Sequence, residues 1–291
     1  MLKGSMVALV TPLKDDNVDE QALRRLVRFQ EENGTDVLVP CGTTGESATL
    51  AYEEHELVIE TVIDEAESAR VLAGSGSNST HEAIRMTRHA EEAGADYALV
   101  ITPYYNKPPQ RGMIDHYRRL AEAVDIGLVV YNVPSRTGIN LLPETVIELS
   151  KIPNIIGVKE ASGDVDQAAR IARGTDEDFA VLSGDDCRTL PMLSVGGQGV
   201  VSVLANLVPD RVNALVHAWL DGQPQLARQI HQELMPLMEA MFWETNPIPV
   251  KAAVSMRGLC KNELRSPMTE LRPELHDKLE KLLSESGVEL Q

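Results

Sequence analysis

Ile155-Ile156-Gly157-Val158-Lys159-Glu160 is a short apolar run that follows a Pro-Asn turn and ends on a lysine. Its β-branched residues and its lack of alternation are typical of a strand that is buried on both faces, as in a parallel sheet. Apolar surroundings disfavour the charged form of an amine, and a desolvated neutral lysine is a nucleophile toward carbonyl carbon. The alternative is that the stem of Lys159 lies along the end of the sheet while its head reaches water.

Seven similar runs are spread along the chain and are separated by segments with helical periodicity. With the lysine run, the expected strands are residues 6–10, 37–39, 71–73, 97–101, 127–131, 155–159, 179–182 and 200–203. Eight strands that alternate with helices predict an α/β fold, the (β/α)8 TIM barrel, whose functional side chains gather at the carboxyl ends of the strands. The alternative is a doubly wound open sheet, but only a partial glycine motif, Gly74-Ser75-Gly76, is present and it follows the third strand.

The helical segments carry clear end signals. Asp19 is suited to cap the first helix, and another helix is expected to begin near Ser79. The pattern Glu-Glu-x-Gly-x-Asp occurs at residues 31–36 and again at 91–96, each time just before an expected strand. We therefore predict that the same loop conformation is used twice.

The chain continues well beyond the last expected strand. Apolar residues at helical spacing predict at least two amphipathic helices there: Leu215, Trp219, Leu226, Ile230, Leu234 and Leu237. Two prolines, Pro247 and Pro249, interrupt this pattern. We expect a catalytic barrel over residues 1–225 and a C-terminal helical extension, packed on the barrel, over residues 226–291.

Composition and charge exclude several classes of protein. The chain is 43% hydrophobic and 24% charged, which is ordinary for a globular protein. A net charge of −17 argues against nucleic-acid binding, and it means that an anionic substrate must be captured by local donors. No apolar run reaches the roughly 18 residues of a membrane helix, and no signal-peptide core is expected at the N-terminus.

The cysteine and histidine patterns bear on compartment and cofactors. Three widely separated cysteines predict no disulfide framework and a reducing compartment, so we expect a cytoplasmic protein. The seven histidines form no motif with the spacing of metal ligands. We therefore expect neither a metal ion nor another cofactor.

The second expected strand is followed by a turn with two threonines. Thr43 and Thr44 lie between glycines, where their hydroxyls and the backbone N–H groups are suited to hold a carboxylate. The alternative is an ordinary glycine turn that leads to a helix cap at Ser47 or Thr49.

Tyrosines and an arginine follow two further strands. Tyr104 and Tyr105 come after the fourth strand and are either proton donors or interface anchors. Tyr131 ends the fifth strand, where it is suited to acid–base chemistry. Arg136 follows five residues later and is suited to clamp a carboxylate, although a surface ion pair is the commoner role of an arginine.

Polar and glycine-rich stretches accompany the last two strands. We assign residues 183–186 and 196–199 to the ends of the seventh and eighth strands, where barrels often bind phosphate or carboxylate through backbone N–H groups. Together with the lysine, tyrosines, threonines and arginine, they favour an enzyme.

Four motifs resemble the dihydrodipicolinate synthase family of the class I pyruvate-dependent aldolases. They are Gly42-Thr43-Thr44-Gly45-Glu46-Ser47, Tyr131-Asn132-Val133-Pro134-Ser135-Arg136-Thr137-Gly138, Gly157-Val158-Lys159-Glu160 and Asn246-Pro247-Ile248-Pro249-Val250-Lys251. The resemblance runs from about Gly4 to the C-terminal helices. The lysine strand is shared across the superfamily, whereas the stretch around Arg136 is specific to the synthases, and the related sialic-acid lyase lacks that arginine.

The resemblance implies a reaction. Lys159 would form a Schiff base with pyruvate, and the resulting enamine would add to L-aspartate-4-semialdehyde, giving 4-hydroxy-tetrahydrodipicolinate for lysine and diaminopimelate biosynthesis. The proton relay of the family matches Thr43, Tyr131 and Tyr105. Its substrate-binding positions match Thr44, Arg136, Gly184 and Val201.

Within that resemblance the residues have separate roles. Thr44 would bind the carboxylate of pyruvate and Arg136 the carboxylate of the aldehyde, while Gly184 and Val201 would line the pyruvate pocket. Tyr105 would reach the site from a neighbouring subunit. The family therefore implies a homo-oligomer, a tetramer of two tight dimers.

Regulated members of the family bind lysine in a cleft at the tight dimer interface. The matching positions here are Ser47, Ala48, His55, Asn78, Glu82 and Tyr104. Glu82 is suited to pair with an ammonium group, and Asn78 and Tyr104 to hold a carboxylate. Tyr52, however, stands where some regulated members have histidine. The alternative is that Asn78 caps a turn while His55 and Glu82 face solvent.

Two other functions compete with the synthase. A 2-keto-3-deoxy sugar-acid aldolase, or an aldolase like the sialic-acid lyase, would share the Schiff base, but a polyol substrate needs hydroxyl partners rather than Arg136. A catalytically silent barrel that acts as a binding protein would be expected to lack some of Lys159, Tyr131 and Arg136.

Overall fold

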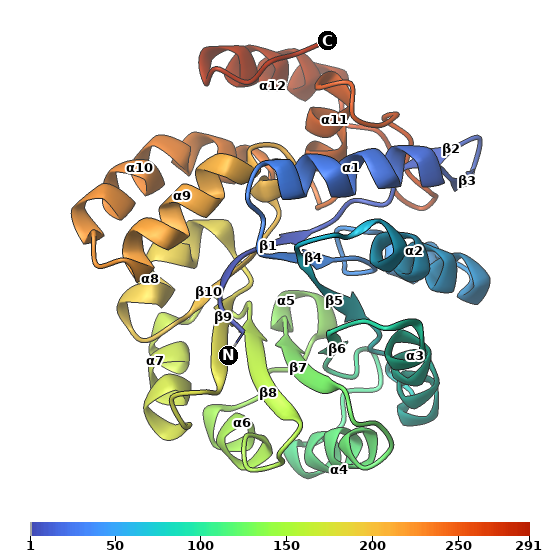
Figure 1. Cartoon of the computed structure of the whole chain (residues 1–291), viewed down its shortest axis with the longest axis vertical. Coiled ribbons are helices and arrows are strands. Elements are labelled where there is room, and N and C mark those ends of the chain that lie inside the picture. The colour runs from blue at the N-terminus through green and yellow to red at the C-terminus, as the bar shows by residue number, and fades with distance from the viewer. Residues whose placement is uncertain (1) are drawn as a thin grey trace. The chain divides into compact units, whose positions relative to one another are not determined.

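The computed structural model describes residues 2–291 and confirms the α/β barrel (Figure 1). Eight strands close the barrel in the order β1-β10-β9-β8-β7-β6-β5-β4. They are β1 (Gly4–Ala8), β4 (Val37–Val39), β5 (Arg70–Gly74), β6 (Tyr97–Ile101), β7 (Gly127–Asn132), β8 (Ile155–Glu160), β9 (Ala180–Ser183) and β10 (Gly199–Ser202). All eight expected runs are strands, and their ends differ from the expected ones by at most two residues.

Helices follow the strands along the chain, as Figure 1 shows. The longer ones are α1 (Glu20–Glu32), α2 (Tyr52–Glu65), α3 (Thr80–Ala93), α4 (Gln110–Ala121), α6 (Pro143–Leu149), α7 (Val165–Gly174), α8 (Thr189–Ser194) and α9 (Pro209–Leu220). Single turns occur at η1 (Ser47–Thr49), α5 (Pro134–Thr137), η2 (Asp186–Arg188) and η3 (Leu204–Asn206). In the described chain, no helix has the length and apolar character that crossing a membrane requires.

The C-terminal region contains the expected amphipathic helices. α10 (Pro224–Ala240), α11 (Ile248–Met256) and α12 (Pro273–Glu285) follow α9. Pro247 stands at the N-cap of α11, so the predicted interruption is a helix start. The division of the chain at residues 225 and 226 stays a prediction.

One element was not expected from the sequence. β2 (Leu13–Lys14) and β3 (Asn17–Val18) form a short antiparallel hairpin whose turn residues, Asp15 and Asp16, have positive φ. Strands of two residues are too short for an alternating pattern to be recognised. The side chain of Glu263 accepts the N–H groups of Asp15 and Asp16, which helps to hold the turn.

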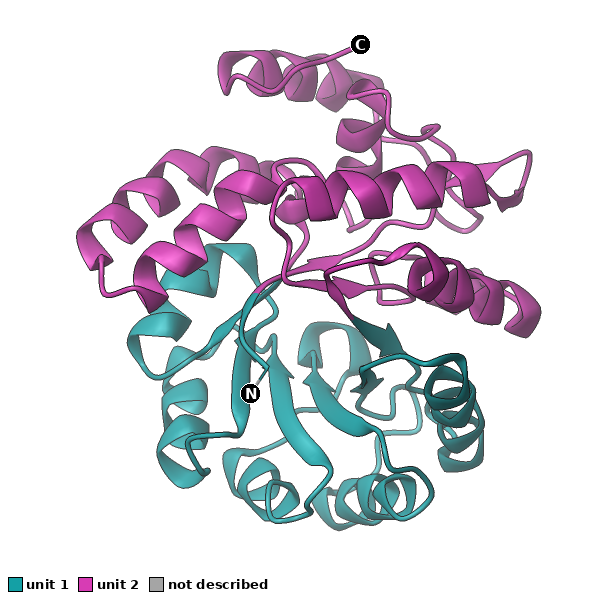
Figure 2. Cartoon of the chain, viewed as in Figure 1, with its two compact units in different colours: residues 1–4, 71–201 teal, residues 5–70, 202–291 magenta. Residues whose placement is uncertain are grey.

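The described residues fall into two compact units (Figure 2). Unit 1 comprises the chain up to Gly4 together with Val71–Val201, and unit 2 comprises Ser5–Arg70 and Ser202–Gln291. Unit 1 therefore contains the lysine strand β8, and unit 2 contains the threonine turn that follows β4.

Within unit 1, β7 and β8 pair in parallel with Tyr131 opposite Lys159. β8 is almost wholly buried, as predicted for a strand covered on both faces. Gly157 permits the close packing of β8 on β9, because a Cβ atom at this position would lie 2.6 Å from the carbonyl oxygen of Ala180.

The repeated Glu-Glu-x-Gly-x-Asp motif adopts the same structure twice, as predicted. In unit 2, Glu31 accepts backbone N–H groups of residues 67–69, and Asp36 accepts the N–H of Ser5. In unit 1, Glu91 accepts the N–H groups of residues 125 and 126, and Asp96 accepts that of Val71. Each motif thus bonds the backbone near the starts of the two strands that flank its own strand. For the first motif these are β1 and β5, and for the second they are β5 and β7.

A buried histidine joins two helices of unit 1. His116 on α4 is almost fully buried, and its Nδ1 lies 2.9 Å from Oγ1 of Thr80 at the start of α3. Burial lowers the pKa of His116 to about 4, because the charged ring would lose its hydration.

We expect stability to decrease as the pH falls from about 6.5 toward about 4, because the unfolded chain then binds a proton that folded His116 does not. Above this pH window His116 is neutral in both the folded and the unfolded chain. Within the window the free energy of unfolding decreases by at most about 3 kcal/mol. Urea unfolding of the wild type and of His116→Gln across this window measures the effect. The same pH slope in both proteins would show that His116 is not its source.

Candidate active site

Lys159 and Tyr131 lie side by side at the carboxyl ends of β8 and β7. The Nζ atom of Lys159 lies 4.2 Å from the centroid of the Tyr131 ring, and the two residues are only 5% and 6% exposed. The lysine head therefore does not reach bulk water, which favours the predicted buried amine over the solvated alternative. An aromatic face stabilises an ammonium group without supplying a carboxylate that would hold its proton.

Gly184 borders this lysine directly. It follows β9, and its N–H donates to the carbonyl oxygen of Glu160 at 2.8 Å. A Cβ atom at this position would lie 3.1 Å from Cε of Lys159 and 2.6 Å from Cβ of Ala161. Only glycine leaves the space beside the lysine open. Val201, the other residue expected to line the pocket, is fully buried on β10.

Arg136 lies on the single turn α5, which follows β7. It is exposed, whereas Thr137 next to it is buried and donates its hydroxyl to the carbonyl oxygens of Val133 and Ile139. Gly138 ends the turn in the left-handed conformation, with φ 73°. The backbone around Arg136 is therefore well fixed, and its side chain extends from a rigid base.

The tyrosines after β6 are exposed in the single chain. Tyr105 is 89% exposed and adopts a left-handed conformation, with φ 69°. Tyr104 is less exposed, and Asn106 beside them donates to the carbonyl oxygen of Asn78 at 2.9 Å. Tyrosine is enriched at protein interfaces, so these exposed rings are suited to contact another molecule.

In unit 2 the turn after β4 holds Thr44 in a buried position. Nδ2 of Asn246 donates to Oγ1 of Thr44 at 3.0 Å. Because this oxygen accepts, the hydroxyl hydrogen of Thr44 is available to donate to a ligand. Thr43 is half-buried in the same turn. The cap alternative is wrong, since α2 begins after Ala51 and neither Ser47 nor Thr49 caps it.

A buried ion pair that the sequence analysis missed fixes this turn. Nζ of Lys251 on α11 lies 2.5 Å from Oε1 of Glu46, and neither side chain is more than 2% exposed. Glu46 also accepts the N–H of Arg265 at 3.0 Å. Burial lowers the pKa of Lys251, and the charge and hydrogen bond of Glu46 act against this effect. Glu46 and Lys251 lie in the motifs at residues 42–47 and 246–251, and these motifs were the sequence signal for the two residues.

The six positions expected to bind lysine are divided between the two units. In unit 2, Ser47 and Ala48 lie on η1, and His55 is buried on α2, so the alternative of a solvent-facing His55 is wrong. In unit 1, Asn78 precedes α3, Tyr104 follows β6, and half-buried Glu82 lies in the first turn of α3.

One expected anion site is wrongly placed. Residues 196–198 precede β10 and therefore lie at its amino end, not at the carboxyl end where substrates bind. Their glycines connect α8 to the strand, and Gly196 has φ 108°. The stretch 183–186 does follow β9, but the N–H groups of Gly184, Asp185 and Cys187 are bonded within the protein.

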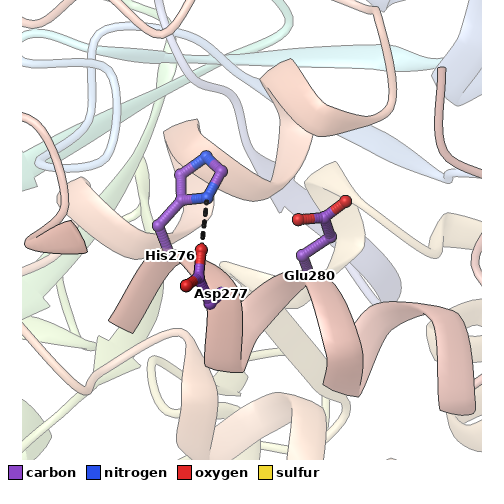
Figure 3. A group of neighbouring side chains, drawn as sticks. All are labelled: His276, Asp277 and Glu280. Atoms are coloured by element: carbon purple, nitrogen blue, oxygen red, sulfur yellow. Dashed lines mark ion pairs between the residues drawn. The ribbon is translucent and has the colours of Figure 1, made fainter. Parts of the chain in front are cut away.

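The described residues contain one group with potential metal ligands (Figure 3). His276, Asp277 and Glu280 lie on α12, and their ligand atoms are within 4.8 Å of one another. Nδ1 of His276 pairs with Oδ1 of Asp277 at 3.9 Å, and both carboxylates are exposed. Neighbouring charges on an exposed helix account for this arrangement without an ion.

Comparison with known proteins assigns the family. Residues 1–286 match the model of the Dihydrodipicolinate synthetase family. The chain belongs to this family. The 4-hydroxy-tetrahydrodipicolinate synthase of Syntrophus aciditrophicus is 52% identical over 289 residues, which cover 99% of each chain.

Solved structures agree over the same extent. Dihydrodipicolinate synthase from Aquifex aeolicus superposes with a TM-score of 0.98 at 47% identity, covering 100% of both chains. The family member from Cyanidioschyzon merolae with lysine bound superposes with a TM-score of 0.95 at 42% identity, covering 98% of both chains.

Proposed function

We propose that this chain is a 4-hydroxy-tetrahydrodipicolinate synthase, a lyase that condenses pyruvate with L-aspartate-4-semialdehyde in lysine and diaminopimelate biosynthesis. The observation that carries the proposal is the buried amine of Lys159, 4.2 Å from the Tyr131 ring at the end of β8. Membership of the family and the arginine after β7 support the same reaction.

The chemistry begins at Lys159. Its neutral amine attacks the keto carbon of pyruvate; one proton is taken up from the relay and water leaves, which gives a protonated Schiff base. Loss of a proton from the pyruvate methyl group forms an enamine, whose carbon attacks the aldehyde of the second substrate. The amino group of that substrate then attacks the iminium carbon and displaces Lys159, which closes the ring and frees the enzyme. The iminium group acts as the electron sink, so this route requires no metal ion or cofactor.

Proton transfer and anion binding fall to the remaining residues. Tyr131, Thr43 and Tyr105 form the proton relay, and Thr44 donates its hydroxyl hydrogen to the pyruvate carboxylate. Gly184 and Val201 line the pyruvate pocket. Arg136 binds the carboxylate of the aldehyde substrate through charge-assisted hydrogen bonds.

An aldolase for 2-keto-3-deoxy sugar acids is the second candidate, because it would use the same Schiff base. Arg136 is the observation that separates the two functions. A guanidinium group suits a terminal carboxylate, whereas a polyol chain would leave it without a matched partner. Aspartate-semialdehyde should therefore be preferred over sugar aldehydes as the partner of pyruvate.

We expect borohydride to trap pyruvate on Lys159 and to leave Lys251 unmodified, since Lys251 is fully buried and its amine is paired with Glu46. Mass spectrometry of the intact protein and of its peptides measures this. Arg136→Ala should still be trapped, but its KM for aspartate-semialdehyde should rise about 10- to 100-fold. An adduct on Lys251, or no adduct, would refute the Schiff-base assignment.

We propose that the chain forms a homotetramer of two tight dimers in which Tyr105 serves the site of its neighbour. The support is the 89% exposure of Tyr105 in a constrained loop conformation. A tyrosine side chain that is exposed to this extent contributes little to packing within its own subunit.

Mixing inactive Tyr105→Phe with inactive Lys159→Ala subunits should restore activity. Recovery should reach about one quarter of the wild-type rate, because half of randomly formed dimers are hybrids and each has one intact site. Lys159→Ala mixed with Lys159→Arg is the control and should stay inactive. If verified subunit exchange restores nothing, Tyr105 does not act across an interface.

We propose further that lysine inhibits the enzyme through Ser47, Ala48, His55, Asn78, Glu82 and Tyr104. The relative from Cyanidioschyzon merolae has been solved with lysine bound, which supports a lysine site in this family. Here Glu82 accepts the hydroxyl of Ser77, so its carboxylate is already oriented at the start of α3. Tyr104 adjoins Tyr105, and a ligand on it would disturb the relay without covering Lys159.

Lysine at millimolar concentration should reduce turnover without simple competition against pyruvate. Glu82→Ala should abolish the effect, because the ammonium group of lysine loses its counter-charge. Glu92→Ala removes an exposed charge from the same helix and is the control. By thermodynamic linkage, if a substrate weakens the binding of lysine, lysine must weaken the binding of that substrate by the same factor. Turnover and calorimetry that both fail to respond to lysine would refute regulation.

Two further proposals concern the cellular compartment and the division of the chain. All three cysteines are free, which fits a reducing compartment, and we place the protein in the cytoplasm. We retain residues 1–225 as the catalytic barrel and residues 226–291 as the helical extension.

A further inference from the structure

A buried group of amides around one carboxylate lies directly behind the catalytic strand ends of unit 1. Glu160 follows Lys159 and is almost fully buried. Its Oε2 accepts Nδ2 of Asn132 at 3.0 Å and Nε2 of Gln167 at 2.8 Å, and its Oε1 accepts the N–H of Ser162 at 2.6 Å. All three partners only donate, so both oxygens of the carboxylate act as acceptors.

Asn140 completes this group. Its Nδ2 donates to Oε1 of Gln167 at 2.8 Å, and its Oδ1 accepts Nδ2 of Asn132 at 2.8 Å. Oδ1 of Asn132 in turn accepts the N–H of Leu141 at 2.9 Å. We call Asn132, Asn140, Glu160 and Gln167 the amide–carboxylate cluster.

The cluster holds two parts of the proposed site at once. Successive residues of a strand point to opposite faces, so Asn132 and Glu160 lie behind Tyr131 and Lys159, with which they alternate. The hydrogen bond from Nδ2 of Asn132 to Oε2 of Glu160 therefore stabilises the strand register that places Tyr131 beside Lys159. The bonds from Asn132 to Asn140 and Leu141 close the loop of residues 133–140 that carries Arg136.

We propose that the amide–carboxylate cluster is a positioning device that sets Lys159 and Tyr131 for pyruvate and Arg136 for the aldehyde substrate. The inference rests on the proposed function for the roles of those three residues. In this proposal the four cluster residues make no direct contact with a substrate. They act through the strand ends and the loop that they join. Substitutions in the cluster should therefore differ in which substrate they affect: those at the loop should affect the aldehyde, and those at the strand ends should affect pyruvate.

Asn140 should govern the loop. Asn140→Ala removes the side-chain bonds of this loop to Asn132 and Gln167 but leaves the bond of Leu141 to Asn132, so KM for aspartate-semialdehyde should rise about tenfold. The rate of borohydride trapping with pyruvate should stay within about twofold of the wild type, because Asn132 still bonds Glu160.

A matched control is available in the same unit. Asn154 precedes β8, and its Nδ2 donates to the carbonyl oxygens of Ala121 and Val124 at 3.0 and 2.9 Å. It is also a half-buried asparagine, with two side-chain bonds where Asn140 has three, but it lies at the amino end of the strand. Asn154→Ala should lower the melting temperature and leave both KM values unchanged.

Glu160 should govern the register. Glu160→Gln turns an amide toward partners that only donate, so pyruvate trapping and kcat should both slow about 10- to 100-fold. Adding Gln167→Glu returns a carboxylate to the cluster, where it can accept the amide introduced at position 160 and Nδ2 of Asn140. Partial recovery of trapping in the double variant would exclude simple misfolding of the single one.

The outcomes are separable. If Arg136→Ala raises KM for the aldehyde but Asn140→Ala does not, the positioning role is wrong and the proposed function stands. If Arg136→Ala has no effect, the role of Arg136 and its positioning by Asn140 both fail. If Asn154→Ala changes the kinetics as much as Asn140→Ala, or if trapping by Glu160→Gln is normal, the cluster is only structural.

Discussion

The site depends on one constraint, which is that an amine must be buried and still be free to react. Lys159 is buried, and the flat face of the Tyr131 ring, not a carboxylate, lies 4.2 Å from its Nζ. That balance requires close packing from all sides. Glycines at positions 157 and 184 allow the backbone of β9 and its loop to approach β8, where any side chain would collide.

The second buried lysine shows how strongly the immediate partner decides function. Lys251 is even less exposed than Lys159, yet Glu46 lies 2.5 Å from its Nζ. A carboxylate at that distance binds the amine in a buried pair that fixes the turn after β4. Within residues 2–291, Lys159 has a ring as its neighbour instead, and no ion pair involves it. Burial alone therefore does not identify a nucleophilic lysine.

The sequence predicted the barrel well because each of its strands is a short apolar run and two of its helices have clear local start signals. Asp19 and Ser79 cap α1 and α3 as expected, since a cap is decided within four residues. The partners of Glu46 and Thr44 lie 205 and 202 residues away, and no local pattern indicates such contacts. The glycines of residues 196–198 were misplaced because a glycine-rich loop has the same composition at either end of a strand.

The polar groups behind the strand ends suggest why neighbouring residues matter as much as the reactive ones. In β7 and β8 the inward residue belongs to the proposed chemistry, and the next residue along the chain belongs to the amide–carboxylate cluster. A buried polar network stabilises a single arrangement only when every member is bonded, since one unpaired group costs its full desolvation. Glu160 satisfies this condition with three donors. The same short strand thus provides the nucleophile on one face and, on the other, the bonds that determine where the nucleophile stands.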